Sequence, residues 1–462
     1  MTADGAGVVS HAGTRLLADL ANATTLTGEL SVVLDGVRGP RPRHDPGRVL
    51  VDLAVAIADG AEAIADIAVL ADQPALFGPV ASDSTCWRLL NALDERRLAA
   101  VAGARARARE VAWAQRAETS GRAFARSRVA GSPGLDALVI DLDAHVLVCH
   151  SEKEQAAPTF KHTFGYHPLL AFLDNTGEFL AALLRPGNAG SNTAADHISV
   201  LDQALAQIPD PYRHGHPVLV RTDGAGCTKA FLRHVRGLRE TGVHSEFSVS
   251  WPVTDREHTA IALLRETDWT AAVDTEGAPR PVDQAAVAEL TGLLPPTSLA
   301  AYPTGTRVIV RRERPHPGAQ LDLIEERDGY RYTAHATDTR IGQHAALDAR
   351  HRAHARIEDR IRTGRDTGLG RLPSRSFAIN AAWLTATMIA IDLLALAQTL
   401  LLHDTELGRV EPKTLRYRLL HTAARLTRGG RQLRLRLDQH WPWATHLAAA
   451  FARLRALPVP AG

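Results

Sequence analysis

The sequence contains few of the residues that define several common protein classes. Its 462 residues include three cysteines, Cys86, Cys149 and Cys227, which are widely spaced and form no Cys-x-x-Cys pair. This spacing argues against a disulfide framework and against a thiolate zinc site, and it fits a reducing compartment. The N-terminal residues show no basic segment followed by an apolar one, so no export signal is visible. We therefore expect a cytoplasmic protein.

A strong overall charge is also missing. Lys and Arg number 53 against 51 Asp and Glu, so any basic surface for a polyanion must be local. Hydrophobic residues make up 45%, enough for two to four domains with a sizeable core. One apolar run, 377–402, has the length to span a bilayer but contains Asn380, Asp392 and Gln398. We favour a helix buried against a sheet and expect no membrane partner.

The first 130 residues have a helical pattern. Ser82 or Asp83 can cap the run "STCWRLLNALDERRLAAV", which carries Trp87, Arg88 and Asn91. Short helices separated by a turn are compatible with a helix-turn-helix that reads a DNA groove. A plain helical bundle fits nearly as well, so 1–130 is a helical, candidate DNA-binding region.

Strand patterns begin after the linker "AGSPGLD". The run "LDALVIDLDAHVLVCH" predicts two strands and "GEFLAALLRPG" a third, followed by a helix over 193–207 and the strands "VLVRTD" and "HSEFSVSW". This order predicts an α/β domain with a mixed sheet and flanking helices, starting at 134–250. Residues 251–342 form a β-rich insertion, and the domain resumes over 343–404. Residues 405–462 predict a basic helical region in which Arg outnumbers acids and aromatic residues are interleaved.

Three acidic positions have the spacing of a metal site. Asp141 and Asp143 lie two residues apart on one strand and face the same side. Asp223 ends a later strand, where such sheets open onto a crevice, and Glu358 lies on a late helix rich in Arg and His. Carboxylates from these elements can hold two Mg²⁺ ions. Taken singly, they could also be edge-strand acids, a turn residue and a salt-bridge partner.

Three blocks of sequence together resemble a known family. They are "DLDAH…HSEKEQAAPTFKHTFGYHPLLAFLD", "VRTDGAG" and "HARIEDRIRTGRDTGLGRLPSRSFAINAAWL", in this order between residues 135 and 402. The combination is similar to bacterial DDE transposases of the 1380 family of insertion sequences. The resemblance implies a ribonuclease-H-like catalytic domain, interrupted by a β-rich insertion between its second and third acids.

The resemblance also implies residue roles. The first acid falls on Asp141 or Asp143, with Asp143 the favoured metal ligand, the second on Asp223 and the third on Glu358. These would hold two ions of Mg²⁺ or Mn²⁺. Related enzymes carry a Tyr, an Arg and a Lys at fixed helical spacing around the Glu. This chain carries His351, His354 and Arg365 at those positions. The proposed DNA-contacting side chains are His351, His354, Arg362, Arg365, Lys161 and Arg88.

The function implied is a DNA transposase that cuts at terminal inverted repeats and joins the 3′ ends to target DNA. Its partners would be double-stranded DNA and a second copy of the chain, in the bacterial cytoplasm at the nucleoid. Two alternatives remain open: a nuclease that hydrolyses without joining, and a decayed or domesticated DNA-binding protein. The second is motivated by the histidines at positions 145, 351 and 354. A zinc site on His351 and His354 is disfavoured, since no third soft ligand has suitable spacing.

Overall fold

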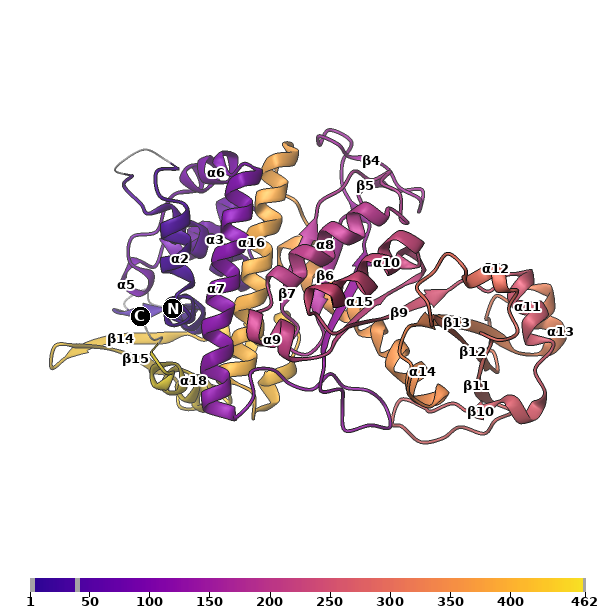
Figure 1. Ribbon diagram of the computed structural model, residues 1–462. Helices are drawn as coiled ribbons and strands as arrows, with labels where there is room; N and C mark the ends of the chain where they lie inside the picture. Colours follow the sequence, from indigo (N-terminus) through magenta and orange to yellow (C-terminus); the bar gives the residue numbers. More distant parts are fainter. Residues whose placement is uncertain (1–4, 38–41, 460–462) are drawn as a thin grey trace.

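A mixed β-sheet forms the centre of the molecule (Figure 1). The computed structural model describes residues 5–37 and 42–459, and these form a sheet of nine strands in the order β10-β11-β12-β13-β9-β8-β2-β6-β7. One half contains β2 (Leu138–Ala144), β6 (Leu169–Leu173), β7 (Phe179–Leu183), β8 (Val218–Thr222) and β9 (Ser245–Trp251).

The direction of these five strands identifies the topology. β6 is antiparallel to β2, β7 is antiparallel to β6, and β8 and β9 run parallel to β2. In chain order the five strands are therefore arranged 3-2-1-4-5 with the second reversed, which is the ribonuclease-H-like arrangement. The predicted mixed α/β fold with flanking helices is confirmed.

The antiparallel neighbour of β2 is a strand that the sequence did not predict. The run after Asp143 forms β3 (Leu147–Val148), which belongs to a separate small sheet with β4 (Ala157–Pro158) and β5 (Phe164–Tyr166). The neighbour of β2 is instead β6, whose five residues are all buried and apolar. A buried run of this length has no alternation, so periodicity could not identify it.

The sheet continues beyond β9 into residues 251–342. Here β10 (Thr270–Ala271), β11 (Ala285–Glu289), β12 (Arg307–Glu313) and β13 (Arg331–Thr337) are joined by antiparallel pairing, and β13 pairs with β9. Three short helices, α11 (Asp255–Ile261), α12 (Pro296–Leu299) and α13 (Leu323–Asp328), lie between them. The β-rich segment therefore lengthens the central sheet.

Alternation along β2 gives the sheet two different faces. Leu138, Ile140 and Leu142 join the hydrophobic cluster that includes α8 (Ala194–Ala206) and α10 (Lys229–Gly237). Asp141 and Asp143 point to the opposite face. There α14 (His344–Arg352) and α15 (Arg356–Gly364) pack, α15 directly against β2.

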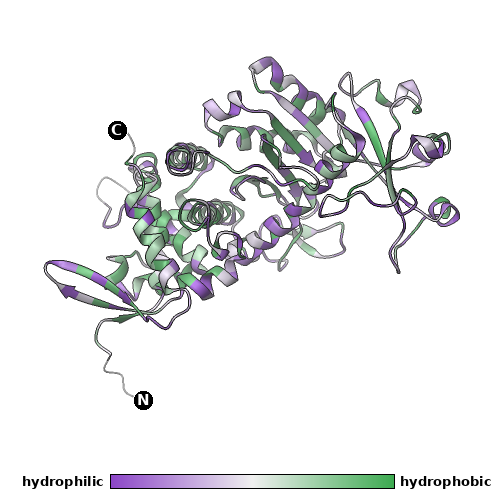
Figure 2. Ribbon diagram, turned by 90° about the horizontal axis from the view of Figure 1, so that it is seen from below, coloured by the Kyte–Doolittle hydropathy of each residue, from purple (hydrophilic) through white to green (hydrophobic). Residues whose placement is uncertain are grey.

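The long apolar helix is part of the core. α16 (Phe377–Leu396) packs against α3 (Pro46–Asp59), α6 (Asp83–Ala92) and α7 (Glu95–Ser120), and also against β7. It is long and apolar enough to cross a membrane, but 89% of its most apolar window is buried inside the protein. In Figure 2, which views α7 and α16 end-on, α16 has the colour of hydrophobic residues. The predicted buried helix therefore lies between a sheet and the N-terminal helices, which also include α1 (Arg15–Ala23) and α2 (Leu26–Val33).

The sequence predicted a helical C-terminal region, but the structure contains a β hairpin there as well as helices. After α17 (Pro412–Leu415) the chain forms a hairpin of β14 (Ala424–Gly429) and β15 (Gln432–Leu437), which pairs with β1 (Val8–Val9), and it then ends in α18 (Ala444–Ala456). The physical signals are the two-residue turn at Gly430 and Arg431, both with positive φ, and the strict alternation of "LRLRL". This period-two pattern indicates a strand. The prediction of a helix rested on the number of basic residues and did not use the period.

Candidate active site

Asp143 and Asp223 lie side by side at the ends of two parallel strands. β2 and β8 are in register with Leu142 opposite Thr222, so the next residue on each strand is an Asp. Neighbouring strands lie about 4.8 Å apart, which brings the two carboxylates to the same edge of the sheet. The Oδ1 of Asp143 accepts a hydrogen bond from the Ala144 amide at 2.8 Å, and that of Asp223 accepts one from the Ala225 amide at 3.0 Å.

The helix α15 brings Glu358 to these two acids. Just before α15, His354 Nδ1 lies 2.8 Å from Oδ1 of Asp141 on β2. Glu358 follows His354 by four residues, one helical turn, and therefore lies on the same side of the helix. Asp143 follows Asp141 by two residues on the same face of β2, so the helix and the strand place Glu358 beside Asp143.

The electrostatics of Asp143 reflect this convergence. Burial raises its pKa, and the negative charges of Asp223 and Glu358 raise it further, to about 6, against the lowering effect of His354. Asp143 is half-buried, whereas Asp223 and Glu358 are exposed. The three predicted acids thus form an open, negatively charged site that favours cations.

Asp141 has a different environment from Asp143. Its two carboxylate oxygens accept hydrogen bonds from Arg221 Nε and Nη2, both at 2.7 Å, and both side chains are buried. Arg221 also lies 3.4 Å from Asp174. Because protein groups already satisfy its oxygens, Asp141 acts as a structural ion-pair partner beneath the site, and Asp143 is the better-placed ligand.

Basic side chains surround the acids on the solvent side. Burial lowers the pKa of His145, and the charges of Arg365, Lys161 and His167 lower it further, to about 4. His145 is therefore neutral at neutral pH. Arg365 and Lys161 are both exposed, so their charges are available to a phosphate near the acids.

The two histidines of the late helix are not placed to donate to a phosphate. His351 lies within hydrogen-bonding distance of the Ser248 and Ser250 hydroxyls, at 3.1 and 3.2 Å, and stacks on His335 at 4.6 Å between ring centroids. Burial lowers the pKa of His351 well below its usual value, so the ring is neutral. His354 is paired with Asp141.

The remaining predicted DNA contacts are Arg362 and Arg88. Arg362 is exposed and pairs with Asp359 and Glu411, at 2.8 and 2.9 Å. Arg88 is exposed on α6, with its Nη2 3.3 Å from the Ser84 hydroxyl. Lys161 and Arg365 therefore lie close enough to His145, two residues after Asp143, for their charges to act there, whereas Arg362 is paired with carboxylates. Arg88 lies on α6.

One further group of side chains could hold a metal ion. Among residues 5–37 and 42–459, only His11, Asp59 and His421 form a group of three whose ligand atoms all lie within 4.8 Å of one another. His11 Nδ1 lies 2.6 Å from Asp59 Oδ2, and the rings of His11 and His421 are 4.3 Å apart. Asp143, Asp223 and Glu358 do not meet this limit, so they converge less tightly than the ligands of a single ion.

A comparison with known protein families identifies the family of the chain. A family model described as "Transposase DDE domain group 1" matches residues 1–459. The chain belongs to the DDE transposases. The enzyme is therefore a DNA transposase.

The other comparisons add less. Among solved structures, the transposase is similar to a piggyBac transposase synaptic complex with hairpin DNA, studied by cryo-EM, with a TM-score of 0.45 and 9% sequence identity. The alignment covers 88% of this chain and 80% of that chain. No curated protein matches the chain.

Sequence reasoning missed the residues that support the acids. Arg221, Asp174 and His354 form a connected ionic group under the site with Asp141. One signal was present: an Arg in the apolar strand "VLVRTD" must have a buried acidic partner, because an unpaired charge on a buried strand is unfavourable.

Proposed function

We propose that this transposase cuts DNA at the terminal inverted repeats of its element and joins the freed 3′ ends to target DNA. The observation that carries the proposal is the meeting of Asp143 and Asp223 at the ends of two paired strands, with Glu358 one turn after the contact between His354 and β2. The charges of Asp223 and Glu358 help to raise the pKa of Asp143. Such a cluster of negative charge is unfavourable unless cations neutralise it. The order of the motifs further supports membership of the 1380 family of insertion sequences.

The three acids fit divalent cations of the magnesium type. They offer only oxygen ligands, which Mg²⁺ and Mn²⁺ prefer, and two of them are exposed to solvent and substrate. We infer that Asp143, Asp223 and Glu358 would hold two such ions. When bound, these ions lower the pKa of the attacking hydroxyl and stabilise the leaving 3′-oxygen of the phosphodiester.

The protein's own groups orient and attract the substrate. The hydrogen bonds from the Ala144 and Ala225 amides hold the carboxylates of Asp143 and Asp223 in fixed directions. Arg365 and Lys161, both exposed beside the acids, would attract a DNA phosphate and offset its charge during the displacement. No covalent intermediate with the protein is required.

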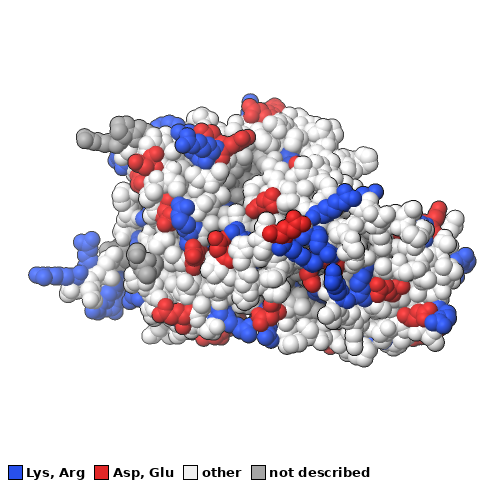
Figure 3. Space-filling view, in the orientation of Figure 1, with Lys and Arg blue, Asp and Glu red and all other residues white. Residues whose placement is uncertain are grey.

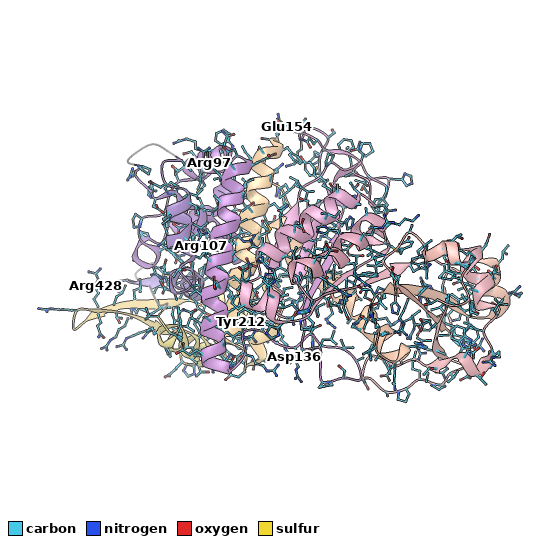
Figure 4. All side chains as sticks on the ribbon, viewed as in Figure 1. Arg97, Arg107, Asp136, Glu154, Tyr212 and Arg428 are labelled. Carbon is cyan, nitrogen blue, oxygen red and sulfur yellow. The ribbon has the colours of Figure 1, made fainter. Side chains whose placement is uncertain are left out.

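The β14–β15 hairpin supports a role for the C-terminal region in DNA binding. It projects from the body, and blue side chains gather on it at the left of Figure 3; Figure 4 labels Arg428 there. Arg425, Arg434 and Arg436 share one face, with Arg425 directly opposite Arg436. Among the described residues no carboxylate pairs with them, so this basic face is free for phosphates. A two-stranded ribbon also has the width to enter the major groove.

The exposed face of α6 supports recognition of transposon ends by the N-terminal helices. Trp87, Arg88 and Asn91 lie on this face and are exposed, whereas Cys86, Leu89 and Leu90 are buried. Stacking, charge and an amide are the groups that read DNA. Assembly as a homodimer on two transposon ends remains part of the proposal.

The direct test is Asp223→Asn. This variant keeps the shape of the side chain and removes its charge, so cleavage of DNA carrying the element's ends in Mg²⁺ should be abolished, while binding of the same DNA in EDTA should persist. Glu326→Gln, at an exposed acid of the insertion, is the matched control and should cleave normally. Normal cleavage by Asp223→Asn would contradict the assigned site.

Two alternatives are separated by the products of the same assay. A nuclease would release cut ends that never join a target plasmid. A decayed DNA-binding protein is favoured by the histidines at positions 351 and 354, which are engaged inside the protein. It would bind the ends and yield no metal-dependent product.

A further inference from the structure

A cavity rich in arginine lies beside α15, the helix that carries Glu358. It has a volume of about 510 Å³ and lies among the C-terminal part of α7, the segment 125–128, the β6–β7 turn, α15 and residues 403–415. Its lining includes seven arginines against three acids, an excess of four positive charges. A concentration of like charge at one place is unfavourable unless an anion compensates it.

The centre of this arginine cavity is Arg360. Its Nε is buried without a hydrogen-bond partner, and among the described residues no hydrogen bond or ion pair involves its guanidinium. The oxygens of Asp174 are already engaged by Arg356 and Ser127. A half-buried guanidinium whose buried Nε donates to nothing is a strong candidate to bind an anion.

The backbone of the β6–β7 turn leaves room for this side chain. Gly177 has φ +79°, and a Cβ built there would lie 2.6 Å from Arg360 Nη1. Any other residue would push the guanidinium away. The position of Arg360 against the cavity therefore depends on a glycine in a left-handed conformation.

Other arginines at the rim are also available. Arg128 is exposed and makes no hydrogen bond or ion pair with any described residue, and the Nε of Arg116 is buried without a partner. By contrast, Arg356 and Arg362 are held by Asp174 and by Asp359 and Glu411. The cavity thus combines arginines that are fixed in place with arginines that can receive a ligand.

We propose that this cavity binds phosphate groups of the DNA backbone. Guanidinium groups match phosphate oxygens in geometry, and a row of them on an open cavity suits a linear polyanion. The inference rests on the proposed function, because DNA is the polyanion on which a transposase acts. The site is distinct from the catalytic acids: Glu358 points to the acids, whereas Arg356, Asp359 and Arg360 of the same helix line the cavity.

Ion pairs connect the cavity to the acidic site. Arg356 bonds to Asp174, which lies 3.4 Å from Arg221; Arg221 holds Asp141, which contacts His354 one turn before Glu358. A phosphate bound to Arg360 would therefore lie beside the ionic group that fixes α15. DNA bound in the cavity would anchor the strand on the side of the helix opposite the reaction.

The test measures binding by full-length protein in EDTA to two labelled duplexes, one with the element's end and one of random sequence, over a range of salt. Arg360→Met should lower affinity about tenfold, the effect of one charge-assisted hydrogen bond. It should also reduce the slope of log K against log salt by about one. Arg128→Gln, at an exposed position, should act in the same direction. Arg265→Gln, at an exposed arginine paired with Asp268, is the control and should bind normally.

Thermal stability separates this role from a structural one. Arg360→Met removes a half-buried charge that has no hydrogen-bond partner among the described residues, so the free protein should be as stable as wild type or more stable. Weaker binding of both duplexes assigns the cavity to phosphates common to both, and weaker binding of one assigns it to that DNA. Unchanged binding by Arg360→Met and Arg128→Gln overturns the proposal. The proposal is also overturned if inorganic phosphate stabilises the wild type but not Arg360→Met, while Arg360→Met binds DNA as well as the wild type does.

The two proposals fail in different ways. If the wild type neither binds nor cleaves DNA, the proposed function fails. If it binds and cleaves DNA, and the arginine variants do so equally well, only the phosphate cavity fails.

Discussion

At the scale of single residues, two aspartates two positions apart on β2 have opposite roles. Asp141 is buried and held by Arg221 and His354, whereas Asp143 is half-buried beside other carboxylates. Asp141→Asn should lower the free energy of unfolding by about 3 kcal/mol, because it leaves Arg221 with an incomplete partner set.

Asp143→Asn is the matched comparison for Asp141→Asn. It should change the free energy of unfolding by less than about 1 kcal/mol, since it relieves repulsion, and it should abolish cleavage. Urea denaturation and the cleavage assay distinguish the two variants. Equal stability losses would show that both aspartates are structural.

Glu289 gives a prediction on pH. Burial raises its pKa, but hydrogen bonds from Arg307 and Thr291 and the charge of Arg307 lower it to about 2. Because the pKa of Glu289 is lower in the folded protein than in the unfolded chain, its charged form stabilises the protein at pH values above the unfolded pKa, near 4.5. This contribution is lost as the pH falls from there toward 2. Urea denaturation between these limits should show a smaller loss for Glu289→Gln than for wild type. Glu326→Gln, at an exposed acid, should follow the wild type.

The residues of the site were predictable from sequence to different degrees. Asp143, Asp223 and Glu358 were proposed from ordered motifs, and in the structure they lie close enough for the charges of Asp223 and Glu358 to raise the pKa of Asp143. The roles of Asp141 and His354 were not found, because they depend on Arg221 and on a contact between residues 213 positions apart. Only tertiary structure creates such partners.

At the scale of elements, the β14–β15 hairpin offers a test of DNA binding. Arg434→Gln together with Arg436→Gln removes two exposed charges from one face of the ribbon. The affinity for DNA should fall, and the slope of log K against log salt should decrease by about two if each arginine contacts a phosphate. Titration of a labelled duplex at several salt concentrations measures both.

The control for the hairpin lies on the insertion. Arg327→Gln removes one exposed charge that is paired with Asp328 and should leave both quantities unchanged. A hairpin variant with wild-type affinity and salt slope would exclude the ribbon from the complex.

Elements with clear periodicity were predicted well, and short or fully buried ones were not. The helix predicted over 193–207 is observed as Ala194–Ala206, and the strand "HSEFSVSW" as Ser245–Trp251. β6 was missed because it lacks alternation, and the hairpin was taken for helix because its arginines drew attention from its period. Local pattern decides an element only when one of its faces is exposed.

At the scale of the whole molecule, a buried ionic group joins the N-terminal helices to the catalytic sheet. Asp392 of α16 accepts hydrogen bonds from Arg105 and Arg109 of α7, at 2.8 and 2.6 Å, and from the Phe179 amide of β7 at 3.0 Å. No sequence pattern predicts this group, because its members lie more than 200 positions apart.

Asp392→Asn should destabilise both parts together. It leaves two buried guanidinium groups short of a charge, so the free energy of unfolding should fall by about 3 kcal/mol. Hydrogen exchange should show the same loss of protection in α7 and in β7. Loss confined to α7 would mean that the two parts unfold independently.

The two edges of the central sheet have a consequence for crowding of the protein on DNA. One edge ends in β10, a strand of two residues, and the other in β7, against which α8 and α16 pack. Neither margin presents a long row of free amide and carbonyl groups, the usual template for runaway strand addition. Strand addition at the margins of the central sheet is therefore disfavoured when copies of the protein gather on neighbouring element ends.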